Sequence, residues 1–203
     1  HLVFVHGGVP SLDRMEELDA WHCMKNDDYW GQGHSFAHTG KYVVVGHWPV
    51  TLYDPRIPSA APIIDRARHI ISIDGGCVLK ASGQINVLMI PDLAQDDFRF
   101  TSFDCLPTVV AQDAQEASPH SFCIHWIDNE IEILRENDGI IHIRHLRTGY
   151  EMDILSSQIY SRTSPVRCAE VTDYRLPVSP GDHLSLVAAT KAGFLCKKAG
   201  VTG

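Results

Sequence analysis

The sequence predicts a mixed fold of the α/β (α+β) class over residues 1–112, followed by a small all-β, barrel-like domain over residues 113–203. Two apolar runs indicate the first domain: Val-Phe-Val-His-Gly-Gly at residues 3–8 and Val-Val-Val-Gly-His-Trp-Pro-Val at residues 43–50. Each run is typical of a buried strand that ends at a histidine beside glycine. Beyond residue 120, short stretches of alternating polarity separated by polar turns indicate the second domain.

The histidines at the ends of these runs, His6 and His47, are the strongest functional signal. Because α/β folds place their chemistry at the ends of strands, we expect the two side chains to converge on one point. The neighbouring Gly7, Gly8 and Gly46 allow unusual backbone φ angles and the close approach of a bulky anion. The pattern therefore favours a phosphate-binding site.

The remaining elements of the first domain follow from local patterns. Ser11 is a candidate N-cap for a short helix over residues 11–18, and the polar residues 19–39 are typical of a loop that crosses a binding face. Prolines at positions 55, 58 and 62 exclude a regular element around them. We expect strands at residues 41–45, 69–74 and 98–103, and a hairpin of residues 77–80 with 84–90 that extends the same sheet.

The second domain is expected to consist of short alternating strands at residues 121–127, 130–134, 139–146 and 150–154. Its charged side chains are predicted to form one solvated face of a sheet: His142, Arg144, His145 and Arg147. Residues 173–203 contain a Pro-Gly-Asp turn, a following hairpin and a Gly-x-x-Gly ending, and they resemble bacterial Src-homology-3-like barrels. The resemblance implies a tail that binds peptide, cell-wall glycan or its own catalytic domain.

Composition excludes several classes of function. A formal net charge of −8 without a cluster of Lys or Arg argues against a nucleic-acid partner and against an anionic membrane. No apolar run approaches the roughly 20 residues that cross a bilayer, and no signal-peptide pattern is present. Six cysteines without a Cys-x-x-Cys pair favour a reducing cytoplasm. Cys77 and Cys123 lie inside apolar strings and are predicted to pack as small hydrophobic residues.

Three motifs in order, His-Gly-Gly at residues 6–8, Gly-His-Trp-Pro-Val at residues 46–50 and Ser-Ile-Asp-Gly-Gly-Cys at residues 72–77, resemble the C-terminal half of the calcineurin-like metallophosphoesterases. They look most like the bacterial serine/threonine phosphatase and diadenosine-tetraphosphatase branch. The resemblance covers about the first 90 residues. It implies half of a four-layer αββα sandwich with a site for two divalent metal ions (Mn, Fe or Zn), in which His6 and His47 are metal ligands.

The same resemblance implies a phosphoric ester hydrolase in which a metal-bridging hydroxide attacks the phosphorus. Its substrates would be protein phosphoserine or phosphothreonine, or a dinucleoside polyphosphate. Gly7 and Gly8 would form the floor of the site, and Lys25 lies where relatives place an arginine that grips the phosphate. Asp74 has two interpretations: it hydrogen-bonds a metal-bound histidine, or it forms a turn before the glycines that follow it.

The chain also departs from the family pattern. The motifs Gly-Asp-x-His-Gly, Gly-Asp-x-x-Asp-Arg and Gly-Asn-His, which supply the bridging aspartate and the other ligands, do not occur in it. We therefore expect a fragment of a longer enzyme that is inactive in isolation. The alternative is a non-catalytic binding module built on a phosphatase-like scaffold.

Overall fold

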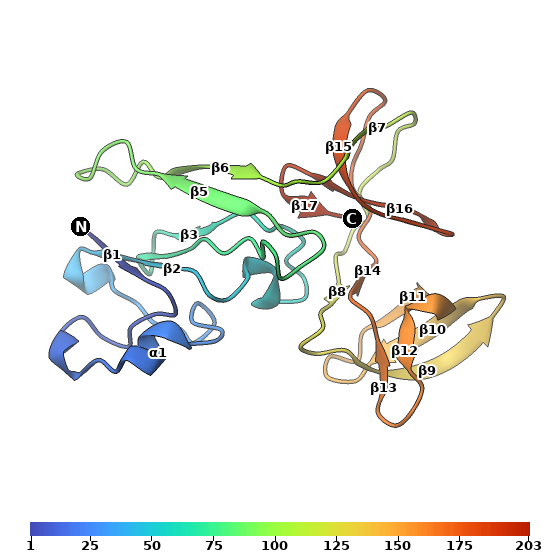
Figure 1. The fold of residues 1–203 in the computed structure, drawn as a ribbon, viewed down its shortest axis with the longest axis horizontal. Coiled ribbons are helices and arrows are strands. Elements are labelled where there is room, and N and C mark those ends of the chain that lie inside the picture. Colours follow the sequence, from blue (N-terminus) through green and yellow to red (C-terminus); the bar gives the residue numbers. More distant parts are fainter. The chain divides into compact units, whose positions relative to one another are not determined.

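A computed structural model describes residues 1–203 and has a mixed α/β fold in which strands predominate (Figure 1). The chain has one α-helix, α1 (Ala20–Met24), and four 3-10 helices: η1 (Met15–Glu17), η2 (Ala37–Thr39), η3 (Val50–Leu52) and η4 (Ser156–Gln158). None of these helices is long and apolar enough to span a membrane. The mixed α/β class is thus confirmed, with far less helix than strand.

The chain divides into two units, which are described separately. The first comprises His1–Asp54, Ser59–Pro107 and Ala199–Val201, and the second comprises Pro55–Pro58, Thr108–Lys198 and Thr202–Gly203. The main division therefore lies at Pro107, a few residues before the boundary expected at residue 112, and two short segments, Pro55–Pro58 and Ala199–Val201, belong to a different unit from the residues around them.

A four-stranded sheet organises the first unit, in the order β1 (Leu2–Val5), β2 (Tyr42–Val45), β4 (Ile70–Ser72) and β3 (Ile63–Asp65). Strands β1, β2 and β4 are parallel, and β3 is an antiparallel edge strand. All four residues of β2 are buried, because hydrophobic clusters cover both faces of the sheet. The carboxyl ends of the parallel strands therefore meet at one edge, where His6, His47 and Asp74 follow them.

The segment between β1 and β2 differs from the expectation. The helix predicted for residues 11–18 is wrong except for the single turn η1, because the Ser11 hydroxyl accepts a hydrogen bond from the Asp13 N–H in a local turn. Instead, α1 lies inside residues 19–39, which were expected to be irregular. Asp19 caps α1 by accepting a hydrogen bond from the Trp21 N–H at 2.6 Å.

The hairpin predicted for residues 77–80 with 84–90 is also wrong. Residues 77–80 form a turn, in which Lys80 N–H donates to Gly76 O and Val78 has a φ of +70°. Strand β5 (Ile85–Met89) pairs instead with β6 (Arg99–Phe103), in a two-stranded sheet separate from that of β1 and β2. A left-handed valine cannot continue a strand, which is why this apolar run turns.

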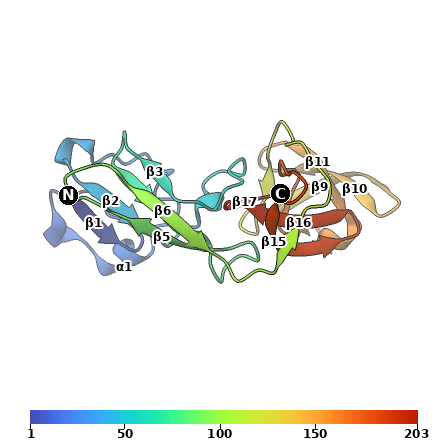
Figure 2. The ribbon, with the colours of Figure 1, turned by 90° about the horizontal axis from the view of Figure 1, so that it is seen from above.

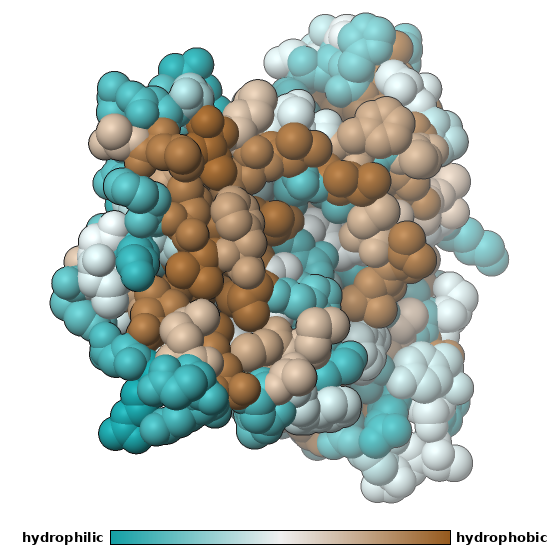
Figure 3. Space-filling view, turned by 60° about the vertical axis from the view of Figure 1, so that its left-hand side comes forward, coloured by the Kyte–Doolittle hydropathy of each residue, from teal (hydrophilic) through white to brown (hydrophobic).

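Several large hydrophobic side chains of the first unit are exposed to solvent. Solvent exposure alternates along strand β5. Ile85, Val87 and Met89 face outward, while Asn86 and Leu88 are half-buried. Phe4 of β1 and Phe103 of β6 are each 65% exposed. Hydrophobic residues form a continuous area on the face shown in Figure 3.

The second unit is built from strands and turns, with the 3-10 helix η4 as its one helical turn (Figure 2). Its antiparallel five-stranded sheet has the order β11 (Glu151–Leu155), β10 (Ile140–His145), β9 (Glu130–Asn137), β13 (Val166–Cys168) and β12 (Ile159–Ser161). Strands β8 (Cys123–Ile124) and β14 (Val171–Thr172) pair with each other. A further sheet has the order β17 (Val201–Thr202), β16 (Gly193–Lys198), β15 (His183–Thr190) and β7 (Thr108–Val110).

The strands expected near residues 123, 130, 140 and 151 are therefore confirmed. Only the last three share a sheet, and the end of the chain does not join it. Residues 173–203 contribute the β15–β16 hairpin to the separate four-stranded sheet. The core of the five-stranded sheet includes Ile131, Ile141 and Ile143.

The prediction that the charged residues of β10 form a solvated face is confirmed only in part. His142 and Arg144 face outward, where they contact Asp153, Glu132 and Glu151. His145 is only 1% exposed, because side chains alternate along a strand and its position points to the opposite face. There its ring contacts the Thr148 hydroxyl and the Asp128 carbonyl, each at 2.9 Å.

Candidate functional site

His6 and His47 lie together at the carboxyl edge of the parallel sheet. The Nε2 atom of His6 is 3.1 Å from the Nδ1 atom of His47, and the two rings meet edge to face. The Gly46 N–H donates to the His6 carbonyl at 3.0 Å, which continues the pairing of β1 and β2 past their last residues. The structure thus brings together the two histidines that the strand-end argument expected to converge.

The backbone at His47 turns sharply to direct its side chain into this site. Its φ is +64°, in the left-handed region that non-glycine residues seldom adopt. Backbone strain of this kind costs about 1–3 kcal/mol and is found mainly at functional sites. The side chain is 12% exposed, so the ring is held by its surroundings.

Asp27 is a site residue that sequence reasoning did not identify. Its Oδ1 atom is 3.0 Å from Nε2 of His47, on the opposite side of the ring from His6. A carboxylate in this position accepts a hydrogen bond from the Nε2–H group and leaves the Nδ1 lone pair available as a donor to a metal ion. The only sequence signal was an acidic residue in the polar loop between the two histidines, a property that Asp27 shares with Asp19 and Asp28.

The two glycines after His6 allow the loop that carries Asp27 to pack closely. A Cβ atom on Gly7 would lie 2.9 Å from the backbone of Met24 and Asn26, and the Gly7 N–H donates to Cys23 O at 2.6 Å. Gly8 has a φ of +136°, and a Cβ atom there would lie 2.3 Å from the Tyr29 ring. Close packing therefore gives a physical reason for both glycines, and their predicted contact with phosphate stays a prediction.

Tyr29 anchors the far end of the same loop. It is 1% exposed, and its hydroxyl donates to the carbonyl of Val9. Burial raises the pKa of the Tyr29 phenol, so the group remains a proton donor across the physiological range. The end of the loop from α1 to Tyr29 is therefore hydrogen-bonded to the segment that follows β1.

The separation of the two histidine nitrogens is that of a hydrogen bond between the rings, and it also suits a shared metal ion. Two donors bound at right angles to one ion, each at about 2.1 Å, lie about 3.0 Å apart. The observed 3.1 Å is close to this value. Neutral imidazole is a suitable ligand for Fe and Zn, two of the metals that the resemblance implies, whereas Mn prefers oxygen ligands such as carboxylate and water. Two nitrogens nevertheless supply only part of a coordination shell.

The other predicted site residues, Lys25 and Asp74, make local backbone contacts. Lys25 is the C-cap of α1, where its N–H donates to Trp21 O and its side chain is exposed. Asp74 accepts a hydrogen bond from the Gly76 N–H at 2.8 Å, as a turn-forming aspartate does. The contact of Lys25 with phosphate and the hydrogen bond of Asp74 to a metal-bound histidine stay predictions.

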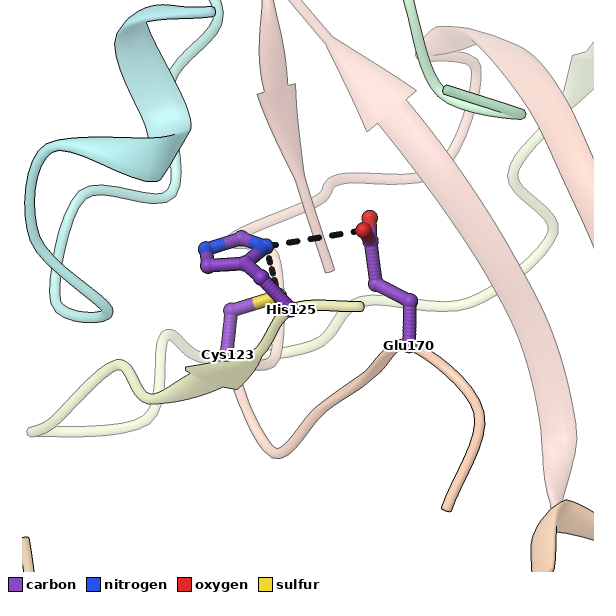
Figure 4. Close-up of side chains that lie close together, drawn as sticks. All are labelled: Cys123, His125 and Glu170. Carbon is purple, nitrogen blue, oxygen red and sulfur yellow. Dashed lines mark hydrogen bonds and ion pairs between the residues drawn. The ribbon is translucent and has the colours of Figure 1, made fainter. Parts of the chain in front are cut away.

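A second cluster of metal-ligating side chains lies in the second unit (Figure 4). Cys123, His125 and Glu170 each direct one ligand atom to a common region, with all three atoms within 4.8 Å of one another. Sequence reasoning treated Cys123 as a small hydrophobic residue and did not consider the other two. The pattern Cys-x-His on a strand was the signal available, since alternate residues share a face.

Comparisons of this chain with protein-family models, curated proteins and solved structures found no match.

Proposed function

We propose that this chain is the C-terminal part of a dinuclear metal-dependent phosphoesterase, whose first unit contributes to a four-layer αββα sandwich. The observation that carries the proposal is the meeting of His6 Nε2 and His47 Nδ1, 3.1 Å apart, at the ends of adjacent parallel strands. The carboxylate of Asp27 on the outer nitrogen of His47 supports it further. The order of the three glycine-containing motifs is the independent sequence argument.

Each residue has a defined part in this proposal. His6 and His47 supply two neutral nitrogens to the same metal ion, and Asp27 holds His47 in the tautomer that leaves Nδ1 unprotonated. The metal ions, when bound, lower the pKa of water and neutralise the charge on the phosphoryl oxygens. Lys25 lies two residues before Asp27 in the sequence and would attract the phosphate as a point charge.

The remaining ligands must come from residues outside this sequence. A dinuclear centre needs a bridging carboxylate and several further donors, and the two histidines with Asp27 do not complete that set. We propose that they are supplied by the Gly-Asp-x-His-Gly, Gly-Asp-x-x-Asp-Arg and Gly-Asn-His motifs of the parent enzyme. The parent would be a cytoplasmic protein that acts on phosphoserine or phosphothreonine in proteins, or on dinucleoside polyphosphates, with the second unit as a peptide- or glycan-binding tail.

The first test is to read the coding sequence upstream of His1 and to express the product that it encodes. If the three motifs are present, purified enzyme with Mn²⁺ should hydrolyse p-nitrophenyl phosphate. His6→Gln and His47→Gln should each lower kcat by more than about 100-fold, because loss of a metal ligand exceeds the roughly 10–100-fold cost of losing an outer-shell partner. The matched control is His38→Gln, an exposed histidine in η2 that should leave kcat unchanged.

An initiation codon directly before His1, or motifs whose aspartates are replaced, would contradict the proposal and favour a non-catalytic binding module. The 203-residue chain itself is expected to show no turnover of p-nitrophenyl phosphate with Mn²⁺. Turnover by this chain alone would show that its residues complete a site without the upstream motifs.

A further inference from the structure

The Cys123, His125 and Glu170 side chains are brought together by the register of two short strands. Strands β8 and β14 are antiparallel, with Cys123 opposite Thr172 and Ile124 opposite Val171. Continuing this register by one residue places Glu170 opposite His125. Cys123 and His125 lie two residues apart and share a face, so all three side chains point to the same side of the pair.

The contacts of His125 are unusual for a hydrogen-bonded triad. Its Nδ1 atom is 3.5 Å from Cys123 Sγ and also 3.5 Å from Glu170 Oε2. In a nucleophile, base and carboxylate relay, the two partners occupy opposite nitrogens of the ring. One nitrogen carries either one proton or one lone pair, and it cannot serve both partners well. The arrangement therefore favours a shared cation beside Nδ1 over acid–base chemistry.

The distances fit tetrahedral zinc. Bonds of about 2.3 Å to sulfur and about 2.0–2.2 Å to nitrogen and oxygen place neighbouring ligand atoms about 3.3–3.6 Å apart. Two of the three separations are 3.5 Å, and the third lies within the 4.8 Å that encloses the group. The Glu170 side chain is 31% exposed, so it is the less enclosed partner of the ion pair that it forms with His125.

The donor types and burial select the metal. Thiolate with imidazole is a set that prefers Zn²⁺ to the hard ions Mg²⁺, Ca²⁺ and Mn²⁺. The His125 side chain is only 6% exposed, so its ring is held in place before any ion arrives. Three protein ligands leave a fourth position open to water or to another ligand.

We propose that Cys123, His125 and Glu170 form a Zn²⁺ site in the second unit, separate in ligands and chemistry from the His6 and His47 site. The ion would join two segments that are far apart in the sequence, β8 and the residue before β14. Because each of these strands has only two residues, their own ladder holds few hydrogen bonds. Closing a long loop with an ion restricts the unfolded chain, so Zn²⁺ should stabilise the second unit.

The experiment is a titration of the reduced 203-residue chain with Co²⁺, followed by competition with Zn²⁺. A cobalt ion bound by thiolate gives a sulfur-to-metal charge-transfer band in the near ultraviolet, which a site made only of histidine and carboxylate does not produce. Cys123→Ser should abolish the band, and His125→Gln and Glu170→Gln should each weaken Zn²⁺ binding by more than about 100-fold. Zn²⁺ should raise the Tm of the wild-type chain and leave the Tm of these variants unchanged.

The matched controls are Cys77→Ser and Cys105→Ser, which remove exposed thiols outside the cluster and should keep the band. His47→Gln should also keep it, so failure of the phosphoesterase proposal does not affect this result. A band that survives Cys123→Ser, or that disappears with Cys77→Ser or Cys105→Ser, would overturn the zinc site. Absence of any band in the folded wild-type chain would do the same. If Cys123→Ser does not fold, Glu170→Gln, which keeps the shape of the side chain, decides the question.

Discussion

The two histidine sites of this protein are built in different ways. In the first unit, His6 and His47 follow adjacent parallel strands, whose carboxyl ends meet at one edge of the sheet. In the second unit, His125 meets Glu170 only because β8 and β14 pair in one particular antiparallel register. The first arrangement comes from fold topology and the second from local pairing. The first can be anticipated from sequence, whereas the second depends on a pairing between distant residues.

The two sites also differ in the ligands they offer. The first offers two imidazoles and an exposed carboxylate, Asp27, a set of donors compatible with Mn²⁺, Fe²⁺ or Zn²⁺. The second offers a cysteine sulfur and a buried imidazole, donors that suit Zn²⁺ better than Mn²⁺. This comparison predicts that the two sites respond to different metals and to different substitutions.

The largest expected effect on stability comes from Gly8→Ala, which tests how the first site is supported. The new methyl group would lie 2.3 Å from the Tyr29 ring, at a backbone φ of +136°. Strain and overpacking together should lower the free energy of unfolding by about 2–4 kcal/mol. Urea unfolding measures the change, and Gly46→Ala is the control, because the nearest atom to its Cβ is 3.9 Å away. Equal stability of both variants would mean that the close packing beneath His6 is not as described.

A smaller effect is expected for Asp27→Asn, which tests the carboxylate on His47. The change removes the charge that orients the ring and should weaken Mn²⁺ binding by about 10-fold to 100-fold. The affinity is measured by titration monitored through the paramagnetic relaxation of water. Asp113→Asn, which alters an exposed acid of the second unit, should have no effect. Equal affinities for the two variants would remove Asp27 from the site.

The smallest effect concerns His142, a histidine that contacts acids without being a proposed metal ligand. The hydrogen bond to Asp153, and then that to Glu151, raises the pKa of His142 above its ordinary value. Because the folded pKa is raised, this contribution to stability is complete below about pH 6.5 and is lost as the pH rises through the raised pKa. The Tm advantage of wild type over His142→Gln should therefore be larger at about pH 6 than at about pH 9. A constant difference would contradict this.

The structural features that could be predicted from sequence are those that depend on local patterns of residues. Apolar runs that end at His6 and His47 predicted β1, β2 and the meeting of the two side chains. Alternating polarity likewise predicted β9, β10 and β11.

The errors arose where distant contacts override local pattern. Residues 77–80 are apolar enough for a strand, yet Val78 is fully exposed in a left-handed turn, and β5 pairs with β6 instead. Asp27 reaches His47 because α1 and the packing at Gly7 direct the loop there, which no short motif records. Cys123 looks hydrophobic until the register places His125 and Glu170 beside it.

The measurement that tests the central claim most directly is an NMR titration of the histidine side chains with Mn²⁺. The chain has 12 histidines, each of which reports on its own surroundings. The account predicts that substoichiometric Mn²⁺ broadens the resonances of His6 and His47 first, while those of His125 and His142 stay sharp and His125 shifts only when Zn²⁺ is added. Broadening that begins at other histidines and spares His6 and His47 would contradict the proposal that this pair holds the metal.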